Sequence, residues 1–150
     1  MFLTSQSTTD APVVHGRTPT VRVARRCWRL EECAAFYVNI VGLSQLYEFS
    51  DHAGYDGVVL ALRGPAVQLE LVSPPDDSPM ASPDDEDLIV ILVDDDRDLD
   101  ARRHRLTRDL GLTVTRPHNP YWRARRAFVV RDPDGRGVMF AFDPDEPPGP

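Results

Sequence analysis

The fold is decided by the stretch SPPDDSPMASPDDED, residues 73–87, near the middle of the chain. Proline fixes φ and removes a backbone donor, and clustered carboxylates repel one another, so this stretch is a poor candidate for a buried helix or strand. It is predicted to be an exposed acidic linker between two modules, residues 19–72 and residues 88–143. The flanking segments, residues 1–18 and 144–150, lack hydrophobic periodicity and are predicted to be a flexible lead and tail.

The first module predicts the order strand, helix, strand, strand, strand. A β-prone stretch at 20–24 precedes a helical pattern at 30–37, in which apolar side chains recur on one face. Gly42 is the expected end of this helix, because glycine readily takes the left-handed backbone conformation that closes a helix. Three further strands are predicted at 44–49, 57–62 and 67–72.

The second module repeats that order. A β-branched apolar strand at 88–93 is followed by a helical pattern at 95–110, which Gly111 is expected to end. The repeat predicts one α+β domain of two β-α-β-β-β modules, which form a curved mixed sheet. Its remaining strands are predicted at 113–115, 127–130 and 137–142.

Composition narrows the range of functions. The chain has 150 residues, of which 41% are hydrophobic, and this is enough for one domain with its own core. Its net charge is −7 and all 17 basic residues are arginine, which argues against general nucleic-acid binding. The sequence has no apolar run long enough to cross a membrane and no secretory signal at its start, so a cytoplasmic protein is expected.

The order and spacing of several motifs resemble the vicinal oxygen chelate superfamily. This superfamily includes glyoxalase I, bleomycin-resistance and fosfomycin-resistance proteins, and extradiol dioxygenases. The resemblance runs from Thr20 to Phe142, and further motifs at 47–57 and 119–122 are similar to its YycE-like subgroup. The other motifs that carry it are Leu30-Glu31 with Phe36-Tyr37 and Gly42-Leu43, Leu69-Glu70-Leu71, Val93-Asp94-Asp95 and Asp132-Pro133-Asp134-Gly135.

The resemblance implies a cup that holds a small molecule, and it also says where a metal would be bound. The four positions that carry metal ligands in the superfamily are here Arg22, Glu70, Leu88 and Met139. Only the glutamate keeps a ligating group, and arginine has no lone pair to donate. No metal and no cofactor are therefore expected, and glyoxalase or dioxygenase chemistry does not transfer. The alternative is a shifted metal site in which Glu70 acts with His52 or His118.

Two charged residues are the candidate catalytic pair. The resemblance implies that Arg22 and Glu70 face each other across the cup, with Leu88 and Met139 beside the glutamate. Arg22 would then clamp an anion or carbonyl oxygen, and Glu70 would act as a general base. The alternative is an ion pair that replaced the metal and has no chemical role.

Further residues are candidates for binding a ligand. His52 and Tyr55 fall in a glycine-containing hairpin, where they could contact a ligand or simply form a surface turn. The aromatic segment 119–122 is expected to be a loop that acts as a lid or stacking wall; the alternatives are a hydrophobic plug and a dimer contact. The candidate ligand-binding residues are Tyr55, His52, Leu88, Asn119, Tyr121, Trp122 and Met139.

The two cysteines are expected to be buried small hydrophobic residues. Cys27 and Cys33 form no C-x-x-C motif and have no histidine beside them in the sequence. Neither a disulfide framework, nor a zinc site, nor a nucleophilic cysteine is therefore predicted.

Three functions remain open. The first is a metal-independent protein that binds a small aromatic or amphipathic molecule, as the resistance-type members of the superfamily do. The second is a metal-independent lyase or isomerase, such as an epimerase or cyclase of secondary metabolism, in which Glu70 removes a proton and Arg22 stabilises the enolate. The third is a structural or partner-binding module whose cup is filled by its own side chains. The resemblance also implies a homodimer.

Overall fold

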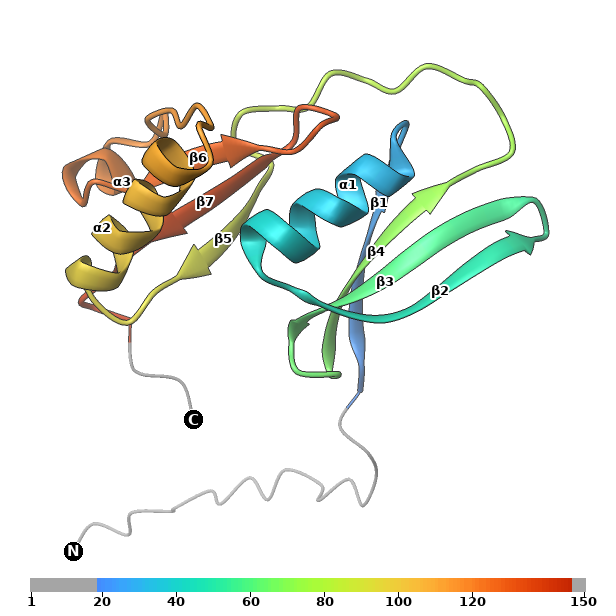
Figure 1. Ribbon diagram of the computed structural model, residues 1–150, viewed down its shortest axis with the longest axis horizontal. Coiled ribbons are helices and arrows are strands. Elements are labelled where there is room, and N and C mark those ends of the chain that lie inside the picture. Colours follow the sequence, from blue (N-terminus) through green and yellow to red (C-terminus); the bar gives the residue numbers. More distant parts are fainter. Residues whose placement is uncertain (1–18, 147–150) are drawn as a thin grey trace, which may run out of the picture.

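The computed structural model describes residues 19–146, which form two β-sheets with helices packed against them (Figure 1). The first sheet has the order β1-β4-β3-β2, and the second has the order β5-β7-β6. The predicted lead 1–18 lies outside the described residues, as does the end of the predicted tail, 147–150. The described residues contain no helix that is long and apolar enough to cross a membrane.

The first module has the predicted order of elements. Strand β1 pairs in parallel with β4, and β3 pairs antiparallel with both β4 and β2. The helix ends as predicted at Gly42, whose φ of 91° is the left-handed conformation that glycine accepts without strain. The elements are β1 (Val21–Arg26), α1 (Leu30–Phe36), its π-helical continuation η1 (Tyr37–Val41), β2 (Ser44–His52), β3 (Tyr55–Arg63) and β4 (Val67–Ser73).

The second module follows the same plan with one strand fewer. The predicted strand at 113–115 contributes a single bridge, between Thr115 and Val129. The expected loop at 119–122 is instead the start of a short helix, because the Asn119 side chain accepts a hydrogen bond from the Tyr121 N–H and Pro120 occupies the first helical turn. The elements are β5 (Leu88–Leu92), α2 (Asp96–His104), its π-helical continuation η2 (Arg105–Asp109), α3 (Pro120–Ala124), β6 (Phe128–Arg131) and β7 (Gly137–Ala141).

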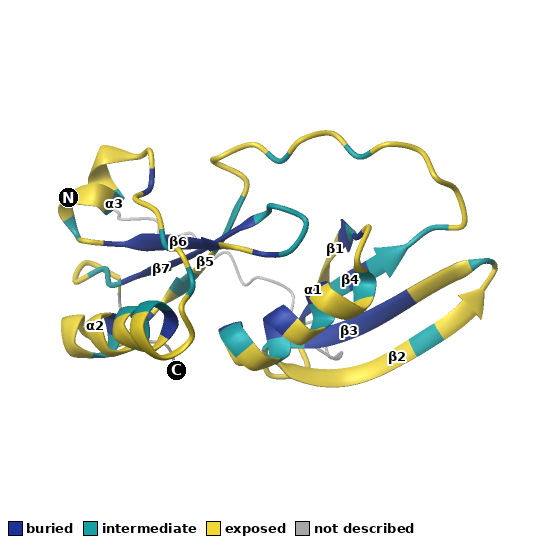
Figure 2. Cartoon of the chain, turned by 45° about the horizontal axis from the view of Figure 1, so that its top comes forward, coloured by how far each residue is buried: buried dark blue, intermediate teal, exposed yellow. Residues whose placement is uncertain are grey.

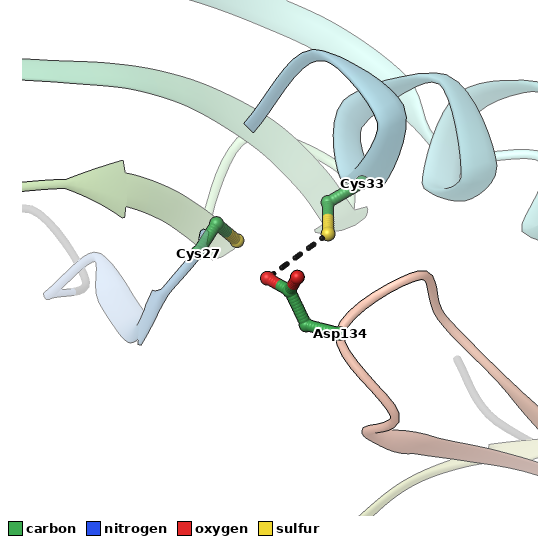
Figure 3. A group of neighbouring side chains, drawn as sticks. All are labelled: Cys27, Cys33 and Asp134. Atoms are coloured by element: carbon green, nitrogen blue, oxygen red, sulfur yellow. Dashed lines mark hydrogen bonds between the residues drawn. The ribbon is translucent and has the colours of Figure 1, made fainter. Parts of the chain in front are cut away.

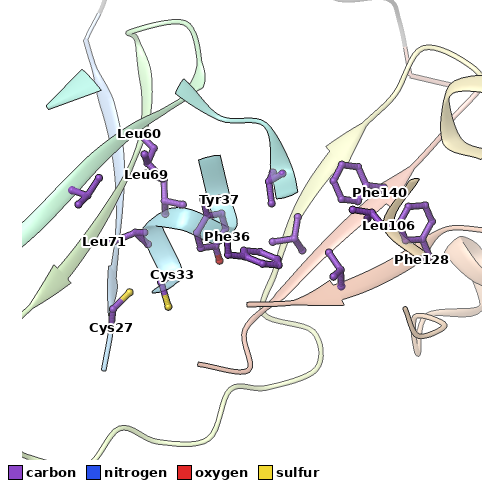
Figure 4. Packing of buried hydrophobic residues seen from close by; sticks show 14 of the residues in the cluster. Cys27, Cys33, Phe36, Tyr37, Leu60, Leu69, Leu71, Leu106, Phe128 and Phe140 are labelled. Carbon is purple, nitrogen blue, oxygen red and sulfur yellow. The ribbon is translucent and has the colours of Figure 1, made fainter. Parts of the chain in front are cut away.

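One hydrophobic core joins the two modules. It combines the buried face of α1 with one side of each sheet, and Phe36 lies between the two groups of side chains in Figure 4. Strands β6 and β7 are almost entirely buried in Figure 2, and so is the middle of β3, whereas β2 is exposed along most of its length. Every residue of β7 is buried, so in the second sheet burial extends to the face that points away from the shared core.

Polar contacts also connect the modules. The Tyr37 hydroxyl accepts a hydrogen bond from Arg25 Nη1 at 3.0 Å and donates one to Asp132 Oδ2 at 2.8 Å. All three side chains are buried, and burial raises the pKa of Tyr37, with the charge of Asp132 adding to the effect. The phenol therefore stays protonated as a donor to Asp132. Arg105 adds bonds to the backbone oxygens of Asn39 and Ile40.

The segment between the modules contains no helix or strand from 74 to 87. Arginines from the strands bind its carboxylates. Arg26 contacts Asp76 at 2.9 Å near one end, and Arg131 contacts Asp85 at 2.7 Å near the other. The segment is thus attached to both sheets and follows the outside of the molecule (Figure 1).

Candidate functional site

The candidate site begins on the face of the first sheet that points away from α1. In the parallel pairing of β1 with β4, Arg22 is opposite Gln68 and Ala24 is opposite Glu70. Side chains alternate between the two faces of a strand, so Gln68 and Glu70 share one face while Leu69 points into the core. The open face of this sheet is therefore polar.

Arg22 is bound by three neighbouring side chains on this face. Its Nε donates to Gln68 Oε1 at 2.9 Å, its Nη1 to Glu70 Oε2 at 3.1 Å and its Nη2 to the Tyr47 hydroxyl at 2.7 Å. The Arg22 side chain is 38% exposed and that of Glu70 is 19% exposed. The guanidinium is thus fixed in orientation, still reaches solvent, and has more N–H donors than these contacts use.

These residues do not fit the metal ion of the superfamily that the sequence resembles. The one carboxylate at the four corresponding positions, Glu70, is already paired with a guanidinium, and a fixed positive charge beside it opposes a divalent ion. The shifted alternative is not assembled either. Within residues 19–146 neither His52 nor His118 joins Glu70 in a group of three ligating residues, and His118 instead contacts Asp85 at 3.1 Å.

The open face of the second sheet is apolar. Met139 on β7 is fully buried, and Leu88 and Trp122 pack against its cluster. Leu88 also lies over Gly137, where a β-carbon would collide with the leucine side chain. The buried members of this cluster are Ala127, Val129, Met139 and Ala141.

The structure does not place Leu88 and Met139 beside Glu70, contrary to the expectation from the sequence. Glu70 lies on β4 of the first sheet, whereas Leu88 and Met139 lie on β5 and β7 of the second sheet. The two sheets share the helix-side core, so their open faces are not stacked on one another within the chain. The polar half and the apolar half of the predicted site are therefore separate in one chain.

His52 and Tyr55 are opposite each other beside the turn of the β2–β3 hairpin, as predicted. Val59 is the residue of β3 that pairs with Glu70. Tyr55 is four residues further along the strand, about 13 Å away at roughly 3.3 Å per residue. Both side chains are exposed, and His52 contacts the ring of Phe49 edge-on. His52 and Tyr55 thus lie closer to the turn of the hairpin than the ion pair of Arg22 and Glu70 does.

The aromatic segment at 119–122 uses most of its polar groups within the chain. The side-chain oxygen of Asn119 caps α3, and the Tyr121 hydroxyl lies 2.9 Å from the carboxylate of Asp143. The Arg125 guanidinium also covers the Tyr121 ring at 3.6 Å from its centre. Trp122 is the member of this segment that packs onto the apolar face of the second sheet.

A groove of about 740 Å³ lies elsewhere, between α1 and the β2–β3 hairpin. Its lining includes the partly buried Val38 and Phe49 and the exposed Glu31, Glu48 and Asp56. It contains none of the site residues predicted from the sequence. Its volume is in the range of small-molecule pockets, so a ligand could bind there and not on the open faces. A substitution in this groove is therefore a suitable control for a binding experiment.

Two residues of the site, Gln68 and Tyr47, were not predicted from the sequence. Gln68 precedes Glu70 by two positions in the alternating stretch QLEL, so the period of a strand could have placed both on one face. Tyr47 is opposite Val59, which in turn pairs with Glu70. That pairing depends on the register of three strands, which no local pattern gives.

Comparison with known proteins identifies relatives for nearly the whole of the described chain. Residues 21–72 match the family model described as the YycE-like N-terminal domain. The chain is 32% identical over 120 residues to the uncharacterized protein YycE of Bacillus subtilis, a match that covers 80% of this chain and 85% of that protein.

Solved structures also include a YycE protein that is similar to this chain. A crystal structure of a YycE protein of unknown function from Bacillus subtilis has a TM-score of 0.75 and 29% identity, over 87% of this chain and 93% of that one. TnmS3, an antibiotic-binding protein from Streptomyces sp. CB03234, has a TM-score of 0.60 and 24% identity, over 84% and 96%. Glyoxalase I of Leishmania major has a TM-score of 0.61 and 19% identity, over 84% and 87%. The last two likenesses establish a shared fold.

Proposed function

Because the chain belongs to the YycE-like family and has the glyoxalase-like fold, we propose that it binds a small organic molecule on the open faces of its sheets without a metal ion. The observation that carries this proposal is the state of Arg22, which takes the place of a metal ligand and is held by Gln68, Glu70 and Tyr47. A guanidinium oriented in this way donates to a carboxylate or carbonyl oxygen of a ligand. That one neighbour of the same fold is an antibiotic-binding protein agrees with this role.

The apolar face of the second sheet suggests what the rest of the ligand is. Leu88 and Trp122, which pack against the fully buried Met139, offer a surface for an aromatic or amphipathic body, with the indole as a stacking wall. The proposed ligand therefore combines an aromatic body with at least one acceptor oxygen.

We further propose that two copies of the chain complete the site in a homodimer. Strands β1 and β5 each lie at one edge of their sheet, and both carry exposed apolar side chains, among them Val23 and Val90. Edges of this kind favour pairing with another strand. If β1 of one copy meets β5 of the other, Arg22 of the first faces the apolar surface of the second. In this arrangement a cytoplasmic dimer would hold two complete sites.

The first experiment is a ligand screen that locates binding by substitution. The probes are aromatic carboxylic acids and aromatic antibiotics, scored by the rise in melting temperature. Arg22→Ala is expected to weaken the best probe about 10-fold or more, because a hydrogen bond to a charged group is worth about 1.5–3 kcal/mol. Glu48→Gln, in the groove beside α1, is the matched control and should leave the affinity unchanged. A probe that responds to Glu48→Gln and not to Arg22→Ala would contradict the proposed site.

The contact of Glu70 with Arg22 favours a second candidate, a metal-independent isomerase, epimerase or cyclase. Glu70 would take a proton from carbon, and Arg22, 3.1 Å away, would stabilise the enolate oxygen that forms. Glu70→Gln distinguishes the two functions. It abolishes turnover in an enzyme but leaves ligand affinity within a few fold in a binding protein. If no probe stabilises the protein, the remaining function is that of a structural or partner-binding module.

A further inference from the structure

A second group of polar side chains lies away from the open faces, where the two modules meet. Cys27 directly follows β1, Cys33 lies on α1, and Asp134 is in the turn between β6 and β7. Figure 3 shows the three side chains pointing toward one another from these separate segments. One ligand atom from each, the two Sγ atoms and a carboxylate oxygen, lie within 4.8 Å of one another. This is the only such group of three ligating residues within 19–146.

The distance between Cys33 and Asp134 fits a tetrahedral metal site, and the other ligand atoms lie within 4.8 Å of one another. Cys33 Sγ lies 3.4 Å from Asp134 Oδ2. With a zinc–sulfur distance of about 2.3 Å and a zinc–oxygen distance of about 2.0 Å, two ligands of a tetrahedral ion are about 3.5 Å apart. Two thiolates and one carboxylate are ligands that zinc prefers, and they leave a fourth position for water.

The surroundings hold Asp134 in place before any ion binds. Its Oδ2 accepts a hydrogen bond from the Trp28 N–H at 2.9 Å, and its own N–H donates to Asp132 Oδ1 at 2.9 Å. Asp132 Oδ1 also accepts from the Arg136 N–H. Support of this kind orients metal ligands and reduces what must be ordered on binding.

The electrostatic environment favours a cation. The Cys33 thiol donates to Asp134 Oδ2, and the buried Asp132 carboxylate accepts the Asp134 N–H, so two carboxylates lie close to the cysteines. Carboxylates attract a divalent ion, and the bound ion would in turn stabilise the two thiolates. Both cysteines are buried, at 3% and 0% exposure, so a bound ion would be shielded from bulk water.

We propose that Cys27, Cys33 and Asp134 bind one zinc ion, with water in the fourth position, and that this ion ties the two modules together. Binding releases the two thiol protons to solvent, and the thiolates and the carboxylate become the ligands. The two sulfurs come from the first module and the oxygen from the second, so the ion stabilises the contact between them. This site is independent of the small-molecule function proposed for the open faces.

Cobalt(II) tests the site, because it replaces zinc in thiolate sites and reports sulfur ligation through a charge-transfer absorption. The full chain is purified without metal-affinity steps, reduced with a phosphine and titrated with Co²⁺, and Zn²⁺ is then added as competitor. We expect the charge-transfer band at about one ion per chain, and its loss on adding zinc. Zinc should also raise the melting temperature.

Four variants test which side chains hold the ion. Cys27→Ser and Cys33→Ser should each abolish the band. Asp134→Asn keeps an acceptor for the Trp28 N–H and should weaken cobalt binding by at least about 10–100-fold, the loss typical when even a group that only supports a metal ligand is changed. The matched control is Asp84→Asn, since Asp84 also accepts a backbone N–H within its turn but lies in the linker; it should change nothing.

Two results would overturn the zinc site: no charge-transfer band in the reduced, folded chain, or a band of unchanged strength in Cys33→Ser. Circular dichroism confirms that each variant is folded, and Asp134→Asn tests the site even if a cysteine variant is not. Glu70→Gln distinguishes the two proposals. If it removes the bound ion while Cys33→Ser does not, the metal lies on the open face, and both the zinc site and the metal-free function are wrong.

Discussion

The two sheets follow the same plan but differ on their open faces. In both, the side that meets the helices is apolar and buried, with Leu69 on β4 and Phe140 on β7 as examples. On the other side, the first sheet carries the ion pair of Arg22 and Glu70, and the second carries the apolar cluster around Met139.

This contrast separates the positions of the repeated module that are set by packing from those that are available for function. A helix-side residue must fill a shared core, so both modules keep it apolar. An open-face residue lies outside that shared core, and in the proposed function it faces a ligand or a second copy, so its chemistry can differ between modules. The following predictions test this division.

The largest effect is expected from neighbouring residues of β4 that face opposite sides. Leu69→Ala removes a fully buried side chain and should lower the free energy of unfolding by about 2–5 kcal/mol. Glu70→Gln should change it by less than about 1 kcal/mol, because a partly exposed ion pair contributes little. Urea unfolding of both variants measures the contrast. Equal losses would show that the open face is part of the core.

The next largest loss of unfolding free energy is expected from removing the buried Tyr37 hydroxyl, which lies between the modules. Tyr37→Phe leaves Arg25 and Asp132 without the group that bridges them and should cost about 1–3 kcal/mol in urea unfolding. Tyr55→Phe, at the exposed hairpin, serves as the control and should stay within about 0.5 kcal/mol. A loss no greater than that of the control would mean that the bridge does not hold the modules together.

A smaller effect distinguishes the starts of the two main helices. The Asp95 side chain caps α2 by accepting from the Asp98 N–H at 2.7 Å, whereas Arg29 at the start of α1 makes no such bond. Asp95→Ala should therefore lower the free energy of unfolding by about 0.5–2 kcal/mol. Arg29→Ala should leave it within about 0.5 kcal/mol. The comparison fails if both variants melt at the same temperature.

The smallest effect on stability, but a large one on assembly, is expected at the edge of the second sheet. Val90→Arg places a charge on β5 and should convert the proposed dimer into a monomer while stability changes by about 0.5 kcal/mol or less. Leu110→Arg is the control, since Leu110 is as exposed as Val90, at 41%, but lies beyond η2. Sedimentation velocity measures both. A native chain that sediments as a monomer would refute the dimer.

Most elements of the fold could be predicted because their signals are local. The buried face of α1 follows from helical periodicity, and its end at Gly42 follows from one residue's conformational freedom. Helix α3 also has a local signal, since Asn119 followed by Pro120 is a typical helix start. The prediction of a loop there is wrong because a helix of only five residues has too little periodicity to be recognised. The strand predicted at 113–115 has few partners in the sheet, which no local pattern reveals.

The site could be predicted only in part. The family resemblance implied that Arg22 and Glu70 face each other across a cup; in the structure they are in contact on the adjacent strands β1 and β4. It did not show that Leu88 and Met139 belong to a separate sheet within one chain, because that depends on how the modules pack. The contact between Asp134 and Cys33 could not be predicted from the sequence either. These residues are 101 positions apart, and only the assembled core brings them together.

The connection between the modules has a consequence for how the chain assembles. Because the shared core and the Tyr37 bridge are non-covalent, the segment from 74 to 87 acts on the modules mainly as a tether that sets their effective concentration for one another. Doubling the length of such a tether costs only about 0.6 kcal/mol, so insertions between Ser78 and Asp84 should be tolerated. A chain cut there should reassemble from its two halves. The same tether would let two copies exchange modules without changing a contact in either core.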